Sequence, residues 1–285
     1  MIDVKILLSH MGDDRDRAMA AKYDGYDLII SGHTHVLLDT LVGRTTIGQT
    51  NRKLRVVGAT KVKMRGDRVV SIEYDNIELK NYDSDVEIER LIEDIEANPA
   101  LKEVVGSVGK AMTHPGLGNL QTTVLKEATG AEIGIYHRGG IRLEGLPVGD
   151  VTVKTLFDNE PFFSQVHTAE MTPAQLRRLI VSKYNDTSNM KESHRVDLYA
   201  TTPYKIIVDE NDMAYDVEFP LLREGRKYRV AVPDYVARNY KAFEAENVER
   251  LSLRVYDLDV AYFRANSPVV VSNELKQSIV VRKKR

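Results

Sequence analysis

The sequence has 285 residues, a length that predicts two domains or one large domain and excludes a minidomain. Hydrophobic residues make up 42% and charged residues 29%, close to globular averages, so disordered and collagen-like classes are excluded. The 40 Lys and Arg against 42 Asp and Glu give a formal charge of −2, so the chain has no basic field to attract nucleic acid, and we expect no nucleic-acid partner.

The sequence contains no cysteine, which excludes disulfides, thiolate metal sites and thiol nucleophiles and leaves the compartment open. Its apolar runs are all shorter than the roughly 18–20 residues of a membrane span. Met1 is followed at once by Ile2-Asp3-Val4 instead of a basic region and an apolar stretch. We therefore expect neither a membrane span nor a signal peptide in these residues.

The N-terminal region predicts a β-α-β unit. Residues 4–9 and 27–31 are short, mostly apolar runs typical of strands in an α/β sheet. The alanine-containing stretch between them favours a helix, which Asp13 or Asp14 could cap. Because two parallel strands cannot cover their own faces and edges, we expect this domain either to lack its first half or to borrow it from another chain.

The predicted secondary structure changes twice in the middle of the chain. Residues 42–79 are short β-type runs separated by polar turns, with a hairpin turn predicted at residues 65–67. Residues 83–105 are an acidic stretch with apolar residues at helical spacing, interrupted at Asn98-Pro99, and they predict a linker. From about Gly106 a second α/β region follows, with helices expected over 119–129 and 172–184 and strands over 132–136, 204–208 and 228–232.

Three of the seven histidines follow the two N-terminal strands. His10 comes after the first strand, and His33 and His35 come after the second. Ligands bind at this carboxyl edge of an open α/β sheet, so the three imidazoles can converge on a metal ion. Gly32 is expected to let the backbone turn sharply before the pair. The alternative is that these are ordinary loop histidines, which is the usual interpretation of an isolated His-x-His motif. Here, however, histidines follow both predicted strands, which favours the metal site.

Residues 6–12 and 27–35 resemble the second half of the calcineurin-like metallophosphoesterase domain found in 5′-nucleotidases. Four later motifs resemble the 5′-nucleotidase C-terminal substrate-binding domain in order and rough spacing: Gly118-Asn119-Leu120, Gly139-Gly140-Ile141-Arg142, Pro161-Phe162 and Pro233-Asp234-Tyr235. The resemblance implies three parts: the C-terminal part of a metallophosphoesterase domain (1–80), a linker helix (81–105) and a substrate-binding domain (106–285). The implied fold is α/β, a partial sheet layer followed by a mixed α/β domain.

The resemblance implies a metal-dependent phosphate-monoester hydrolase that converts a nucleotide, a nucleoside monophosphate or a related ester, to a nucleoside and phosphate. Two divalent metals bridged by an Asp activate water in that family. The resemblance places His10 and His33 on one metal and His35 on the other, and imidazole suits Zn, Mn, Fe or Co. It also implies substrate-binding roles for Asn119, Gly139, Gly140, Arg142, Phe162 and Tyr235. Arg142 would clamp the phosphate, while Phe162 and Tyr235 would sandwich the base.

The sequence also departs from the family pattern. The family's Asp-x-His, Gly-Asp and Gly-Asn-His-Glu blocks have no counterpart, so the bridging carboxylate and the catalytic histidine are missing from them. We therefore expect at most one weakly held metal and no phosphatase activity from these residues alone. In the second region His137-Arg138 stands where the family has Asn, residues 239–241 replace Gly-Gly-Asp, and only Lys110 lies near the place of an upstream Arg.

Plainer interpretations stay open at this stage. Asn119 could cap a helix, Phe162 and Tyr235 could be core aromatics, and Arg142 could pair with Glu144. The remaining histidines are expected on the surface or in loops: His114, His137, His167 and His194. The alternative function is a non-catalytic nucleotide-binding or partner subunit that complements a separate phosphoesterase chain.

Overall fold

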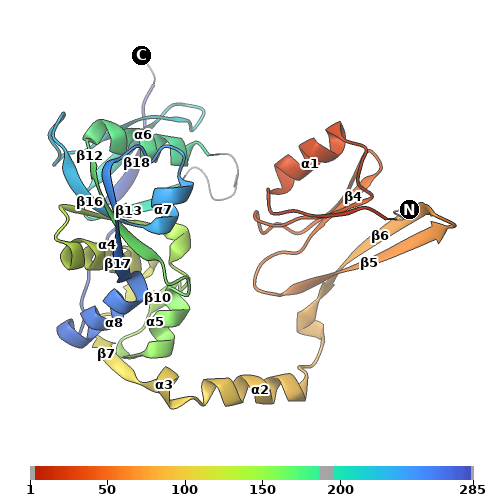
Figure 1. Cartoon of the computed structure of the whole chain (residues 1–285), viewed down its shortest axis with the longest axis horizontal. Helices are drawn as coiled ribbons and strands as arrows, with labels where there is room; N and C mark the ends of the chain where they lie inside the picture. The colour runs from red at the N-terminus through yellow and green to blue at the C-terminus, as the bar shows by residue number, and fades with distance from the viewer. Residues whose placement is uncertain (1–3, 187–194, 284–285) are drawn as a thin grey trace. The chain divides into compact units, whose positions relative to one another are not determined.

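The computed structural model describes residues 4–186 and 195–283, which divide into two compact units. Unit 1 contains the described residues up to Arg90 together with Asp186, and unit 2 contains those from Leu91 to Asn185 and from Arg195 onward. Both units contain helices and strands, which confirms the predicted α/β class (Figure 1). No helix of the described ranges is long and apolar enough to cross a membrane.

Unit 1 is built on a four-stranded sheet in the order β1-β2-β4-β3. Its strands are β1 (Ile6–Leu8), β2 (Leu28–Ile30), β3 (Leu38–Val42) and β4 (Thr45–Gln49). Strands β1, β2 and β4 run parallel to one another, and β3 pairs antiparallel with β4. Helix α1 (Asp13–Lys22) connects β1 to β2, so the predicted β-α-β unit is confirmed. It packs Ala20 against a small core with Ile29, Leu38 and Ile47.

The start of α1 differs from the expectation. Gly12 is the N-cap residue, and it makes no side-chain hydrogen bond because it has no side chain. Asp13 and Asp14 lie in the first helical turn, where carboxylates favour the positive end of the helix dipole. The prediction that one of them caps the helix was therefore wrong.

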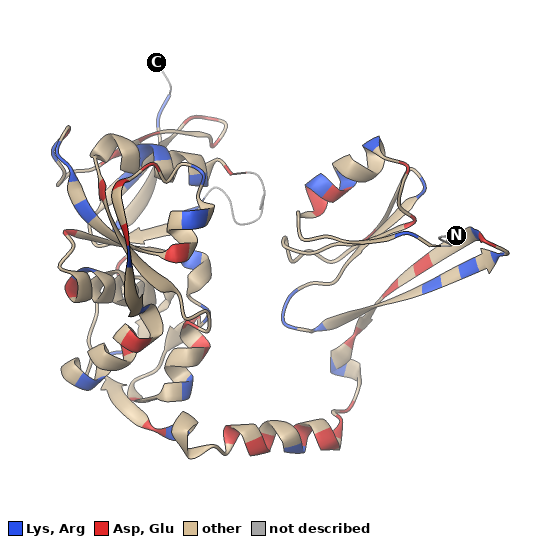
Figure 2. Cartoon of the chain, viewed as in Figure 1, with Lys and Arg blue, Asp and Glu red and all other residues tan. Residues whose placement is uncertain are grey.

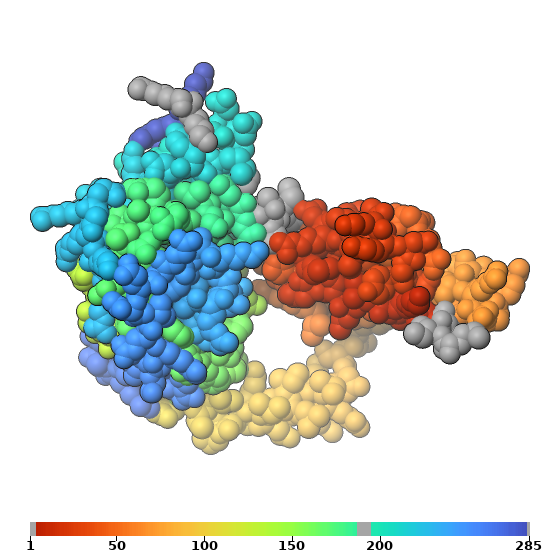
Figure 3. Space-filling model, turned by 45° about the horizontal axis from the view of Figure 1, so that its top comes forward, coloured from red at the N-terminus to blue at the C-terminus, as the bar shows by residue number. Residues whose placement is uncertain are grey.

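A long hairpin follows the sheet. Strands β5 (Val56–Arg65) and β6 (Arg68–Glu78) pair antiparallel and project from the body of unit 1 (Figure 3). The predicted turn is confirmed, with Gly66 at φ 61°. The ring of Tyr74 anchors the hairpin, since a Cβ atom at Gly48 or Gly58 would lie 2.2 or 2.1 Å from that side chain. Both glycines are needed for this close contact.

The segment expected as a linker helix, residues 81–105, contains two helices, α2 (Val86–Glu96) and α3 (Pro99–Lys102), and the short helix η1 (Leu79–Asn81) precedes them. The break falls at Asn98-Pro99 as expected, because the Asn98 side chain accepts a hydrogen bond from the Ala100 N–H and caps α3. The boundary between the units lies inside α2. Acidic residues follow one another along α2 (Figure 2).

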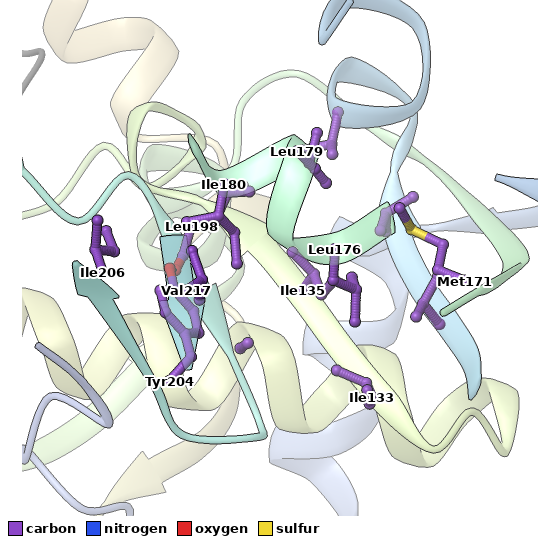
Figure 4. Close-up of a cluster of buried hydrophobic side chains, with 14 of the residues drawn as sticks. Ile133, Ile135, Met171, Leu176, Leu179, Ile180, Leu198, Tyr204, Ile206 and Val217 are labelled. Carbon is purple, nitrogen blue, oxygen red and sulfur yellow. The ribbon is translucent and has the colours of Figure 1, made fainter. Parts of the chain in front are cut away.

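Unit 2 has a central five-stranded sheet in the order β13-β9-β16-β12-β17. Its strands are β9 (Ile133–His137), β12 (Gln165–Met171), β13 (Leu198–Ala200), β16 (Tyr228–Pro233) and β17 (Glu246–Arg254). Alternate residues face two cores. Ile133 and Ile135 face the core that contains helix α6 (Pro173–Tyr184), shown in Figure 4, whereas Tyr136 faces the core of α4 (His114–Thr129) and α8 (Val255–Asn266).

Smaller elements complete unit 2. Strands β14 (Tyr204–Val208), β15 (Ala214–Glu218) and β18 (Gln277–Val281) form a three-stranded sheet. The others are β7 (Val104–Val108), β8 (Met112–Thr113), η2 (Arg138–Gly140), β10 (Gly145–Leu146), β11 (Gly149–Thr152), α5 (Val153–Asn159) and α7 (Asp234–Asn239). Of these, η2 contains Gly139 and Gly140, and α7 contains Tyr235.

Candidate functional site

Two groups of sequence-predicted residues lie in different units. In unit 1, His10 follows β1 and His33 follows β2, at the carboxyl ends of two paired parallel strands. Their ring centroids lie 5.1 Å apart with 69° between the ring planes. His35 is exposed, and no ring contact joins it to this pair in the described part of the chain. The structure thus brings two of the three candidate metal ligands into contact.

Gly32 has a different purpose from the one expected. Its φ angle is outside the left-handed region, so the backbone there does not require glycine. A Cβ atom at this position would lie 2.9 Å from Nδ1 of His10 and 3.3 Å from the Ser9 carbonyl oxygen. Glycine therefore leaves room for the His10 ring. The left-handed positions fall on His33 and His35 themselves, at φ 79° and 55°, which is strained backbone of the kind found at functional sites.

A buried carboxylate fixes the two strand ends. Asp16 of α1 is fully buried and accepts hydrogen bonds from the hydroxyls of Ser9, at 2.5 Å, and Ser31. Ser31 also contacts Gln49, whose amide donates to the Val36 carbonyl at 3.2 Å. Ser9 and Ser31 come just before His10 and His33, so their hydrogen bonds to Asp16 hold the loops that contain the two histidines. Sequence analysis missed Asp16, although its place one turn before buried Ala20 on the same face of α1 was a usable signal.

The side chains near His10 and His33 determine how many metal ligands this edge of the unit 1 sheet can supply. In residues 4–186 and 195–283, no three His, Asp or Glu side chains lie together as a group able to hold a metal ion. The Asp16 carboxylate is hydrogen-bonded to serine hydroxyls. His10 and His33 fit two positions of a transition-metal coordination sphere, whereas a complete two-metal centre does not fit the described residues.

In unit 2, the Gly-Gly-Ile-Arg motif follows the central strand β9. Gly139 and Gly140 lie in or at the end of the turn η2, and the Arg142 backbone N–H donates to the Asn159 carbonyl at 3.0 Å. The Arg142 guanidinium donates to the Gly139 carbonyl at 3.3 Å and lies 5.7 Å from the centre of the Phe162 ring. Arg142 therefore contacts a candidate base-stacking residue, and no described ion pair joins it to Glu144.

The two candidate stacking residues are on the surface. Phe162 is 55% exposed, after α5, and Tyr235 is 48% exposed, in the first turn of α7. The alternative that they are core aromatics was therefore wrong. The inner face of Tyr235 lies on the ring of His137, with centroids 4.6 Å apart and 18° between the planes. Sequence analysis did not connect these two rings because they are far apart along the chain.

Asn119 has a structural place. It lies within α4, which begins at His114 because Thr113 caps it and Pro115 occupies its first turn. The buried Asn119 amide donates to the carbonyls of Ser272 and Glu274, at 2.8 and 2.9 Å. The interpretation as a helix cap and the predicted start of the helix were both wrong. This side chain ties the segment before β18 to α4.

The expectation that the remaining histidines are surface or loop residues was wrong for three of them. His137 and His167 are buried in the central sheet. His114 is half-buried, and its Nδ1 lies 2.8 Å from the hydroxyl of Tyr199, which also accepts from Arg138 at 2.8 Å. Burial and the Arg138 charge lower the His114 pKa. His194 is outside the described residues.

Known proteins are similar to this chain both in sequence and in fold. Residues 106–247 match the model of the 5′-nucleotidase C-terminal domain. The trifunctional nucleotide phosphoesterase protein YfkN of Bacillus subtilis (strain 168) is 27% identical over 210 residues, which are 65% of this chain and 14% of that protein. The chain thus spans a small part of this curated relative.

Solved structures show the same fold over nearly all of the chain. The 5′-nucleotidase precursor from Thermus thermophilus has a TM-score of 0.71 at 17% identity, covering 96% of this chain and 63% of that one. The sulfate thiohydrolase SoxB from the same species has a TM-score of 0.68 at 18% identity, covering 99% and 56%. The resemblance recognised from the sequence motifs is confirmed: residues 106–247 match the 5′-nucleotidase C-terminal domain, and the solved structures that share the fold include a 5′-nucleotidase.

Proposed function

We propose that unit 2 binds a nucleoside monophosphate, or a related phosphate ester, for a metal-dependent phosphoesterase reaction that yields a nucleoside and phosphate. One observation carries this proposal: the Arg142 guanidinium lies beside the exposed Phe162 ring in the family-matched region. A planar cation suits the phosphate and an exposed aromatic face suits the base. Gly139 and Gly140 shape this loop, and Tyr235 offers a second exposed ring.

For unit 1 we propose the C-terminal part of a metallophosphoesterase domain, followed by the linker and by the substrate-binding domain of residues 106–285. His10 and His33 would hold one Zn, Mn, Fe or Co ion weakly, with His35 reserved for a second metal in a complete site. Such metals supply an activated water and polarise the phosphoryl group. The metal-bridging carboxylate would come from other residues, in the same protein or a second chain. The strand β1, with Leu8 80% exposed, offers an edge for them.

The second candidate is a non-catalytic nucleotide-binding or partner subunit that complements a separate phosphoesterase chain. The metal ligands favour this candidate, because the described residues provide no group of three metal-ligating side chains. Two dications close together need carboxylates to neutralise them. Under both candidates, the 285 residues alone bind nucleotide without turnover.

Calorimetric titration of the full 285-residue chain with AMP tests the binding function. We expect weak binding that Phe162→Ala or Tyr235→Ala reduces by about 1–3 kcal/mol, the typical loss of one base stack. Tyr82→Ala removes another exposed ring, in the segment before α2, and serves as the matched control. Absence of heat at millimolar AMP, or equal binding by all four proteins, would overturn the proposal.

A phosphate-release assay with added Zn²⁺, Mn²⁺ or Co²⁺ tests the catalytic part. We expect no hydrolysis of AMP by the chain alone, and at most one Co²⁺ bound per chain with loss of binding in His10→Ala and His33→Ala. Turnover that His33→Ala abolishes would show that these residues suffice for catalysis. Retention of two metals after dialysis would contradict the proposed partial site.

A further inference from the structure

The ring of His137 lies under Tyr235 and is buried. His137 ends β9 and is 6% exposed, whereas Tyr235 belongs to α7 and is half-exposed. Their rings are nearly parallel, 18° apart in plane and 4.6 Å between centroids. The Tyr136 ring is also 5.3 Å from that of His137, at 28°. One face of Tyr235 is therefore covered by a ring that the sheet itself holds in place.

Gly140 makes this arrangement possible. A Cβ atom at position 140 would lie 2.5 Å from Cε1 of His137 and 2.8 Å from Cε1 of Tyr136, both closer than any stable contact. At the neighbouring Gly139, the nearest atom to a Cβ would be 3.8 Å away, in ordinary contact. Of the two glycines in the motif, Gly140 is the one whose missing side chain makes room for the imidazole.

The imidazole is neutral at physiological pH. Burial is the main cause that lowers its pKa to about 3, and the positive charges of Lys183 in α6 and of Arg142 add to it. Asp234 in α7 opposes the shift and does not outweigh it. Nδ1 is buried without a hydrogen-bond partner in the described residues, which costs free energy that an ordinary apolar core residue would not cost. A neutral ring so placed presents a flat face to Tyr235.

We infer that His137 is a positioning residue: its ring supports the inner face of Tyr235, so that only the outer face receives the planar base of the nucleotide. This inference rests on the proposed function of unit 2. An aromatic pair restricts the ring of Tyr235 before the ligand arrives, and a restricted ring loses less entropy on binding. The support acts through Tyr235 and not by contact with the ligand.

A double-mutant cycle on the full chain tests the inference. We expect His137→Ala to weaken AMP binding about threefold to tenfold, the range of one lost aromatic pair, while His137→Phe restores it. In a Tyr235→Ala background, His137→Ala should have no further effect, because the residue acts through that ring. An equal loss in both backgrounds would show a general structural role and overturn the inference.

A second measurement needs no ligand and separates this inference from the proposed function. In chain labelled with 3-fluorotyrosine, the ¹⁹F resonance of Tyr235 is assigned by its loss in Tyr235→Phe. We expect His137→Ala to move this resonance to the position of an exposed tyrosine, with that of Tyr82 unchanged as control. An unmoved resonance would overturn the support of Tyr235 by His137. Absence of AMP binding by the unaltered chain would instead overturn the nucleotide function.

Discussion

The buried carboxyl group of Asp259 makes the stability of unit 2 depend on pH. Asp259 lies in α8, is fully buried, and accepts a hydrogen bond from the Gln121 side chain of α4 at 2.7 Å. Burial is the main cause that raises its pKa from 3.8 to about 8; the Gln121 hydrogen bond opposes this rise and the negative charge of Glu160 adds to it. The perturbation to make is Asp259→Asn, which keeps the shape and cannot ionise.

The sign follows from the direction of the shift. Because the folded-state pKa lies above the unfolded one, the folded chain holds a proton that the unfolded chain releases between about pH 4 and 8. The contribution of Asp259 to stability is thus complete below pH 4 and is lost as the pH rises through 8. Between pH 5 and 8 the free energy of unfolding should fall by about 3–4 kcal/mol, at roughly 1.4 kcal/mol per pH unit over most of that range.

The assay is urea unfolding of the full chain, followed by far-UV circular dichroism at pH 5, 6, 7 and 8. Glu160, also buried with a raised pKa, contributes a slope of the same sign to both proteins, so the difference between them isolates Asp259. Asp257→Asn is the matched control, an exposed carboxylate of the same helix paired with Arg254 at 2.6 Å. It should keep the pH profile of the unaltered chain. Parallel profiles for the unaltered chain and Asp259→Asn would refute the reasoning.

Three further substitutions test two close contacts, at Gly140 and Gly32, and the hydrogen bonds of Asn119. Gly140→Ala should destabilise the chain by about 1–3 kcal/mol in urea unfolding, because its Cβ would lie 2.5 Å from His137, whereas Gly139→Ala should change stability by less than about 0.5 kcal/mol. Gly32→Ala should displace the His10 ring and weaken Co²⁺ binding seen by absorbance, with Gly25→Ala, which meets nothing within 4 Å, as its control. Asn119→Ala should cost about 1–3 kcal/mol in urea unfolding and speed amide hydrogen exchange at residues 272–277, since two carbonyls lose their donor. An unchanged urea midpoint would contradict the prediction for Gly140→Ala, and an unchanged Co²⁺ spectrum would contradict that for Gly32→Ala. For Asn119→Ala, an unchanged midpoint or unchanged hydrogen exchange would contradict the prediction.

The sequence predicted the features that depend on neighbouring residues. The β-α-β unit follows from two apolar runs and a helix-favouring stretch, and the proximity of His10 and His33 follows from their places after two paired strands. The start of α4 was missed because the cap lies at Thr113, ahead of the apolar residues used to place the helix. The order of the motifs pointed to the 5′-nucleotidase C-terminal domain that residues 106–247 match, because each motif keeps its own local spacing.

Contacts between distant parts of the chain could not be predicted in this way. His137 carries no local sign that it lies under Tyr235, since one ends a strand and the other begins a helix in another part of unit 2. Histidine is intermediate between typical core and surface residues, so only the packing of the sheet shows that this one is buried. The same holds for Asn119, whose two acceptors belong to the segment before β18.

The two units use their buried polar groups in different ways, and this difference bears on function. In unit 1 the buried carboxylate, Asp16, is bound to two serine hydroxyls, so it fixes the loops that carry His10 and His33 and leaves the metal charge to be neutralised by other residues. In unit 2 the buried imidazole of His137 is neutral and supports a ring on the surface. The first arrangement orders ligands whose metal needs further donors, whereas the second already presents an aromatic face to a ligand. Under the function that we propose, nucleotide binding is the step that these residues perform on their own, and hydrolysis is the step that requires carboxylates beside His10 and His33.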